Sequence, residues 1–127
     1  TLQILLAEDN EINRFLAEEL LKGLGHEVTT VQDGRQALDA LARERFDVVL
    51  MDVQMPRMHG DEVTRRIRAG EAGDPNVPIV ALTAYALKGD RERFLAAGMN
   101  DYLAKPIDME ELGRVLARIG SVGKGTE

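Results

Sequence analysis

Acidic residues follow two of the apolar segments of this 127-residue chain, and their types suggest metal chemistry. Glu8 and Asp9 come directly after the aliphatic run at residues 4–7, and Asp52 follows the run at 48–51. Carboxylates held a few ångströms apart repel one another, and the usual relief is a raised pKa or a bound cation. Because the ligand atoms would be hard oxygens, with no histidine or cysteine adjacent, the expected cation is Mg²⁺.

A hydroxyl and an ammonium group follow two further apolar segments. Thr83 comes after residues 79–82, and Lys105 comes after residues 101–104. A metal ion alone needs neither group, whereas a tetrahedral anion can use a hydroxyl on one oxygen, an ammonium on another and a cation on a third. An aspartate placed among these groups can attack phosphorus and become an acyl phosphate, and Asp52 is the candidate.

These five side chains can meet only if the apolar segments become neighbouring parallel strands. The segments are short and do not alternate with polar residues, which is typical of strands buried on both faces. Strands are expected at 4–7, 27–31, 48–51, 79–82 and 101–104. Segments with helical spacing follow each one, so strict alternation predicts an α/β fold with helices on both faces of a parallel sheet. In such sheets the ligand site lies beyond the carboxyl ends of the strands.

The helices are predicted from apolar residues three and four positions apart. These residues are Ile12, Leu16 and Leu20; Ala37, Leu38, Leu41 and Ala42; Val63 and Ile67; and Leu112, Val115, Leu116 and Ile119. The fourth helix, at 88–97, contains Gly89 and has mainly Phe94 and Ala97 as anchors. Because it is weakly anchored, we expect it to be the segment that moves most readily.

Length and charge limit the remaining possibilities. A chain of 127 residues fits one domain, expected over 1–120 with a flexible tail at 121–127. Acids outnumber bases 22 to 16, which argues against direct nucleic-acid binding. The aliphatic runs are far shorter than the roughly 20 residues that span a bilayer, so no membrane contact is expected of this domain. The absence of cysteine is compatible with the reducing cytoplasm, where we expect the domain to lie.

Four motifs in order resemble the receiver domain of two-component response regulators, and the resemblance covers residues 4–119. The motifs are Leu6-Ala7-Glu8-Asp9-Asn10, Met51-Asp52-Val53-Gln54-Met55-Pro56, Ala81-Leu82-Thr83-Ala84 and Asp101-Tyr102-Leu103-Ala104-Lys105-Pro106. Each motif is weak alone, but all four in this order are specific. The resemblance implies a single-domain, doubly wound (βα)5 fold of flavodoxin-like topology with strand order 2-1-3-4-5.

The resemblance also implies a role for each acidic residue. Asp52 would accept a phosphoryl group from a histidine kinase or a histidine phosphotransfer domain. Asp9, Asp52 and the backbone carbonyl of Gln54 would bind Mg²⁺, and Glu8 would hold the cation through a water. Mn²⁺ is expected to be able to substitute for Mg²⁺.

A conformational switch is implied for the other site residues. Thr83 and Lys105 would contact the phosphoryl group. In the family the hydroxyl residue moves toward the phosphate, an aromatic side chain at the position of Tyr102 turns inward behind it, and the face formed by the fourth helix, fifth strand and fifth helix changes shape. The bond between Lys105 and Pro106 would be cis, a form that is accessible to X-Pro bonds at modest cost.

Two longer sequence segments most resemble those of receivers fused to hybrid sensor kinases. They are Glu8-Asp9-Asn10-Glu11-Ile12-Asn13-Arg14 and Ala81-Leu82-Thr83-Ala84-Tyr85-Ala86-Leu87-Lys88-Gly89. Such receivers usually exchange phosphate with a histidine phosphotransfer domain, and the parent chain would be a histidine kinase, for which membrane attachment is an option. His59 departs from the pattern, since many members have Asp there, but this position is not a metal or phosphate contact.

Two other functions share some of these features. Haloacid-dehalogenase-like phosphatases have the motif Asp-x-Asp after a strand, whereas the second position of that motif, residue 54, is Gln here. A flavodoxin-like FMN binder needs a glycine- and hydroxyl-rich phosphate loop after the first strand, and the acidic segment 7–11 would repel that phosphate. A receiver would instead catalyse its own phosphorylation and slow dephosphorylation, at a rate tuned by Gln54 and Tyr85, which flank the site.

Overall fold

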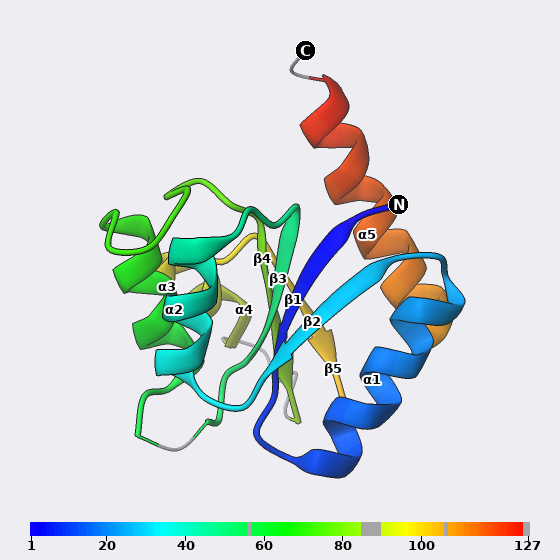
Figure 1. Cartoon of the computed structure of the whole chain (residues 1–127), viewed down its shortest axis with the longest axis horizontal. Helices are drawn as coiled ribbons and strands as arrows, with labels where there is room; N and C mark the ends of the chain where they lie inside the picture. The colour runs from blue at the N-terminus through cyan, green and yellow to red at the C-terminus, as the bar shows by residue number, and fades with distance from the viewer. Residues whose placement is uncertain (56, 85–89, 106, 126–127) are drawn as a thin grey trace.

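Strands and helices alternate along the chain in the computed structural model, which describes residues 1–55, 57–84, 90–105 and 107–125 (Figure 1). The elements are β1 (Gln3–Ala7), α1 (Glu11–Gly23), β2 (Glu27–Val31), α2 (Gly34–Arg43), β3 (Val48–Asp52), α3 (Gly60–Arg68), β4 (Ile79–Thr83), α4 (Asp90–Ala97), β5 (Asp101–Ala104) and α5 (Met109–Gly125). The five strands form one sheet in the order β2-β1-β3-β4-β5, and all neighbours are parallel. The predicted fold class and strand order are confirmed.

The apolar runs occupy the centre of the sheet, as their composition predicts. Strands β3 and β4 are buried along their whole length, and β1 is exposed only at Gln3. The edge strand β2 alternates between exposed and less exposed residues over most of its length. A strand with helices on both faces has no polar side to present, so an uninterrupted apolar run identifies a central position.

Two hydrophobic layers hold helices against the two faces of the sheet. Alternate side chains of β1 point in opposite directions, so Leu5 and Ala7 join one layer, and Ile4 and Leu6 join the other. Helices α2, α3 and α4 cover the first face, and α1 and α5 cover the second (Figure 1). The helix residues buried in these layers include Ala37, Leu38, Leu41, Val63, Ile67 and Phe94 in the first, and Ala17, Leu21, Leu112, Val115 and Leu116 in the second. Together the layers cover both faces of the sheet.

Helix α1 differs from the face that its apolar spacing suggests. Its buried residues are Ala17 and Leu21, whereas Ile12 is 70% exposed and Leu16 is 55% exposed. Phe15, also 58% exposed, lies beside them on the helix surface. Ile12 and Leu16 of the i+4 series therefore lie on an unburied apolar surface, whereas Leu20 is partly buried and packs against the core. A smaller difference occurs in α2, where Ala42 is exposed.

The last two helices agree with the sequence except at their ends. Phe94 and Ala97 anchor α4 in the core as predicted, while Lys88 and Gly89 lie outside the described residues. Helix α5 continues to Gly125 and so passes residue 120, where we expected the domain to end; the flexibility of residues 121–127 stays a prediction. Within the described residues, no helix combines the length and apolar character needed to cross a bilayer.

Candidate functional site

The predicted site residues lie at the carboxyl edge of the sheet. Parallel register places Ala7 beside Met51, and Asp52 beside Leu82, so the ends of β1, β3 and β4 are level. The N–H of Lys105 donates to the carbonyl of Thr83 over 2.8 Å, which brings the end of β5 to the same edge. Four segments that are distant in the sequence thus meet at one edge of the sheet, because their strands are parallel and end level with one another.

Lys105 bridges two buried carboxylates at this edge. Its Nζ atom lies 2.6 Å from Oε1 of Glu8 and 3.2 Å from Oδ2 of Asp52. Glu8 is 1% exposed and Asp52 is 3% exposed, and the lysine side chain is itself largely buried. A buried charge is tolerated only when it is paired, so this lysine accounts for the presence of both acids inside the fold.

The two buried carboxyl groups differ in the direction of their pKa shifts. Burial raises the pKa of Glu8 from 4.5 to about 7, and its hydrogen bond with Asp52 adds to this effect. Burial also acts to raise the pKa of Asp52, but the hydrogen bonds from Glu8 and from the Gln54 amide, together with the charge of Lys105, bring it below its ordinary value. Burial likewise opposes the charge of Lys105, yet its contact with Glu8 and the charge of Asp52 raise its pKa above the ordinary value. Asp52 is therefore the ionised member near neutral pH, when Glu8 is partly protonated.

The acidic cluster fits a divalent cation. Carboxylate oxygens of Glu8, Asp9 and Asp52 lie within 4.8 Å of one another, and Asp9 is exposed while the other two are buried. The backbone N–H of Gln54 donates to Oδ1 of Asp52 over 3.0 Å, so the Gln54 peptide group borders the same site. Three acids and one lysine leave two unbalanced negative charges, and oxygen ligands of this kind suit Mg²⁺.

Two residues that support the acidic turn were not assigned a role by sequence reasoning. The N–H of Asn10 donates to Oε2 of Glu8 over 3.2 Å, and its side-chain Oδ1 accepts from the N–H of Asn13 over 2.9 Å, capping α1. Nη1 of Arg14 donates to the carbonyl of Glu8 over 3.0 Å. The preference of Asn for helix N-termini was a signal for the cap that the Asn10 side chain forms with the N–H of Asn13. The contact between Arg14 and the carbonyl of Glu8 depends on where a long side chain reaches in the folded chain.

Gly60 was not among the predicted site residues, yet its lack of a side chain matters at the end of β3. A Cβ atom there would lie 2.6 Å from the carbonyl oxygen of Asp52 and 2.9 Å from Cα of Val53. Both are backbone atoms, which cannot move aside as a flexible side chain can. Helix α3 consequently starts directly against the end of β3, and only glycine permits this approach.

The remaining predicted residues occupy different positions. Thr83 is buried at the end of β4, and Gln54 is exposed beside Asp52. Tyr102 is half-buried and packs against the layer formed with α2, α3 and α4. His59 is exposed at the N-cap of α3 and makes no side-chain capping hydrogen bond. Tyr85 and the Lys105–Pro106 bond lie outside the described residues.

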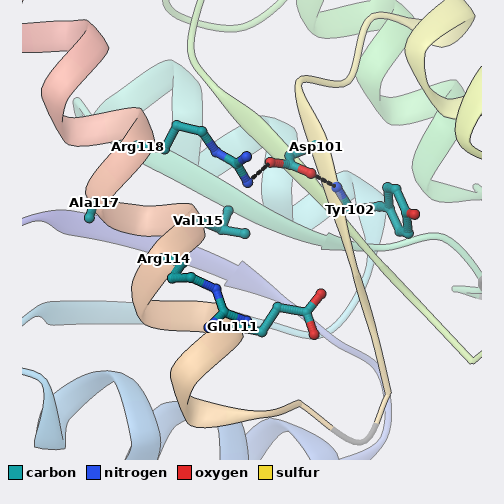
Figure 2. A pocket seen from close by; sticks show the side chains of 7 residues that line it. All are labelled: Asp101, Tyr102, Glu111, Arg114, Val115, Ala117 and Arg118. Carbon is teal, nitrogen blue, oxygen red and sulfur yellow. Dashed lines mark hydrogen bonds and ion pairs between the residues drawn. The ribbon is translucent and has the colours of Figure 1, made fainter.

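A separate cleft of about 650 Å³ lies between β5 and α5 (Figure 2). Asp101 begins β5, and its carboxylate binds Arg118 of α5 at 2.6 Å. Tyr102 also borders the cleft, but its ring extends to the other side of β5 in Figure 2. Because Asp101 stands at the amino end of its strand, the cleft is separate from the acidic cluster.

Comparison with known proteins agrees with this geometry. The family model described as response regulator receiver domain matches residues 4–117. Sensor protein GacS of Pseudomonas syringae pv. syringae is 44% identical over 118 residues, which are 91% of this chain but 13% of that protein. The chain thus spans a small part of that relative.

Two solved structures share the fold. The receiver domain of sensor histidine kinase PA1611 from Pseudomonas aeruginosa PAO1 has a TM-score of 0.85 and 54% identity, covering 94% of this chain and 98% of that one; its structure has a magnesium ion coordinated in the active-site cleft. The receiver domain of Ssk1 from Saccharomyces cerevisiae, in a co-crystal with the histidine phosphotransfer protein Ypd1, has a TM-score of 0.88 and 28% identity, covering 97% and 91%.

Proposed function

Because the chain belongs to the response regulator receiver domain family and so serves phosphorelay signalling, we propose that Asp52 is its phosphoryl acceptor. The observation that supports this assignment is the pairing of a buried aspartate, whose pKa is lowered, with Lys105 at 3.2 Å. The carboxylate is ionised at neutral pH and has a lone pair available for attack on phosphorus. It lies at the end of β3, at the carboxyl edge of the sheet.

Phosphoryl transfer from a phosphohistidine follows from this arrangement. An oxygen of Asp52 forms a bond to phosphorus, the bond between phosphorus and the imidazole nitrogen breaks, and the imidazole keeps that electron pair. Lys105 exchanges part of its contact with the acids for a phosphoryl oxygen, and Thr83 donates to another. Asp9, Asp52 and the Gln54 carbonyl would hold Mg²⁺, with Glu8 acting through a water; the cation would neutralise phosphoryl charge, and Mn²⁺ is proposed to substitute.

Acceptor identity is tested by phosphorylation with acetyl phosphate. The wild type is expected to gain acid-labile phosphate in MgCl₂ and to lose this gain in EDTA, whereas Asp52→Asn gains none. Asp39→Asn, a matched change on the exposed part of α2, is expected to behave as the wild type. Equal labelling of Asp52→Asn and the wild type would overturn the assignment.

We propose that the partner is a helical domain that carries the donor histidine and binds the exposed surface of α1. Ile12, Phe15 and Leu16 form an apolar surface on a helix that starts two residues after Asp9. A partner seated there is therefore next to the acidic cluster. The related Ssk1 receiver was crystallised with a histidine phosphotransfer protein, and GacS is a sensor protein, so we place this chain in a hybrid histidine kinase.

The partner surface is tested by comparing transfer from two phosphoryl donors, only one of which must dock. Phe15→Ala is expected to slow transfer from a phosphorylated phosphotransfer domain by about tenfold, as loss of an aromatic interface contact does. Its labelling by acetyl phosphate, which needs no docking, is expected to stay within about twofold of the wild type. Leu95→Ala, which removes an exposed leucine from α4, serves as the control. Equal slowing with both donors would contradict docking on α1.

The switch is also part of this proposal. After phosphorylation, Thr83 moves toward the phosphate and Tyr102 turns further inward, which alters the surface of α4, β5 and α5. Slow self-dephosphorylation follows because water reaches the exposed edge, and Gln54 and Tyr85 tune its rate. Gln54 in place of a second aspartate argues against a haloacid-dehalogenase-like phosphatase, and Glu8 at the end of β1 argues against an FMN phosphate site.

A further inference from the structure

The turn after β1 must direct two consecutive carboxylates toward one point. In an extended strand neighbouring side chains point to opposite faces, so Glu8 and Asp9 can converge only if the chain leaves the strand conformation between them. The parallel ladder ends at Ala7, which pairs with Val31 and Met51. The carbonyl groups of residues 8 and 9 lie beyond this ladder, and the sheet does not set their orientation.

Arg14 supplies hydrogen bonds to these two carbonyl groups. Its Nη1 atom lies 3.0 Å from the carbonyl oxygen of Glu8 and 3.5 Å from that of Asp9. The side chain is half-buried, and its own backbone N–H donates to the carbonyl of Asn10 over 2.9 Å in the first turn of α1. A guanidinium keeps its charge and has donors fixed in one plane, so it can orient neighbouring carbonyls as a unit.

We propose that Arg14 is a positioning residue for the divalent cation site, acting through the peptide groups of Glu8 and Asp9. This inference rests on the proposed function, because it assumes that the acidic cluster binds Mg²⁺. Rotation of either peptide group would carry its carboxylate away from the others, whose oxygens lie within 4.8 Å. The start of helix α1 thus contacts the site in two ways. The N–H of Asn10 orients the Glu8 carboxylate, and Arg14 orients the peptide group that follows Glu8.

The test measures Mg²⁺ binding directly, by following backbone amide resonances of the turn during MgCl₂ titration at constant ionic strength. Arg14→Gln is expected to weaken binding by about tenfold, the lower end of the effect seen when residues that orient metal ligands are removed. Arg14→Lys keeps the charge and a donor and is expected to recover most of the affinity. Arg43→Gln is the matched control: it removes the same charge from an exposed position at the end of α2.

A kinetic readout distinguishes positioning from general support of the fold. In Arg14→Gln the Mg²⁺ concentration that gives half-maximal labelling by acetyl phosphate should rise about tenfold, while the rate at saturating Mg²⁺ stays within about threefold of the wild type. An Mg²⁺ affinity equal to that of Arg43→Gln, with lowered thermal stability, would overturn the inference and leave the acceptor assignment intact. Failure of the wild type to label at Asp52 would instead overturn the proposed function. The two failures can be distinguished because the Mg²⁺ binding titration uses no phosphoryl donor.

Discussion

At the scale of single residues, the site is shaped by one ammonium group that serves two buried carboxylates. Lys105 contacts both Glu8 and Asp52, and Asp9 adds a third acid nearby. One positive charge cannot stabilise all three anions, so one acid takes up a proton more readily than the others. That acid is Glu8, whose burial raises its pKa to about 7, while the pKa of Asp52 lies below its ordinary value.

The raised pKa of Glu8 predicts how the stability of the metal-free protein depends on pH. The folded chain binds a proton more tightly than the unfolded chain between pH 4.5 and about 7. The contribution of Glu8 is thus fully present below 4.5 and is lost as pH rises through 7. Glu8→Gln removes this loss, so its free energy of unfolding relative to the wild type should rise between pH 5 and pH 8, by up to about 3 kcal/mol.

Urea unfolding in EDTA at the two pH values measures this difference. Glu19→Gln changes an exposed glutamate on α1 and should show no comparable rise. A difference between Glu8→Gln and the wild type that is constant or falls with pH would show that burial does not raise the pKa of Glu8 in the folded protein.

At the scale of elements, the N-termini of three helices differ in how they are capped. Asn10 caps α1 through Asn13, and Asp33 caps α2 by accepting from the N–H of Gln36 over 2.8 Å. Helix α3 starts after His59, whose side chain makes no such bond. Helix α3, which begins against the end of β3, therefore has the weakest local start of these three.

Replacing His59 by Asp should strengthen that start. An aspartate at the N-cap can accept from the exposed N–H groups of the first turn and interact favourably with the helix dipole, so His59→Asp is expected to raise the free energy of unfolding by about 0.5–1 kcal/mol at pH 7. The value lies at the low end because Asp61 and Glu62 already place negative charge there. Urea unfolding measures it, with Asp33→Ala as a control that should lose stability; an unchanged or lower value for His59→Asp would refute the capping argument.

At the scale of the whole molecule, the acidic character of the chain is partly local to the site. The net charge is −6, and the cluster of three acids with Lys105 holds two of those six charges when all four groups are ionised. The remaining excess is spread over an ordinary surface. A divalent ion bound at the carboxyl edge would neutralise the cluster and favour the folded state, which alone brings these residues together.

Added MgCl₂ should consequently stabilise the unphosphorylated protein in a pH-dependent way. At ten times the dissociation constant the gain is about 1.4 kcal/mol, which corresponds to a rise of a few degrees in melting temperature. The rise should be larger at pH 8 than at pH 6, because the cation competes with a proton at Glu8. Melting curves at matched ionic strength in NaCl provide the control, and an equal rise with NaCl would contradict specific binding.

The sequence by itself determined the strands, their alternation with helices and the residues at the strand ends. These features are local: a strand covered on both faces needs an unbroken apolar run, and the residues after it must lie at the carboxyl edge. The fold class and the position of these residues at one edge of the sheet could be predicted for this reason. The prediction for α1 was incomplete, because spacing shows that Ile12 and Leu16 share one side of a helix but not whether the sheet covers that side.

Only the tertiary structure decided the contacts that depend on distance through space. Gly60 proved to be a point of backbone contact with Asp52, Arg14 proved to reach the carbonyl of Glu8, and Lys105 proved to join both buried acids. Each contact is set by how elements pack, which no local pattern encodes. The proton affinity of Glu8 belongs to the same class, because burial and neighbouring charge arise only when the strand ends meet.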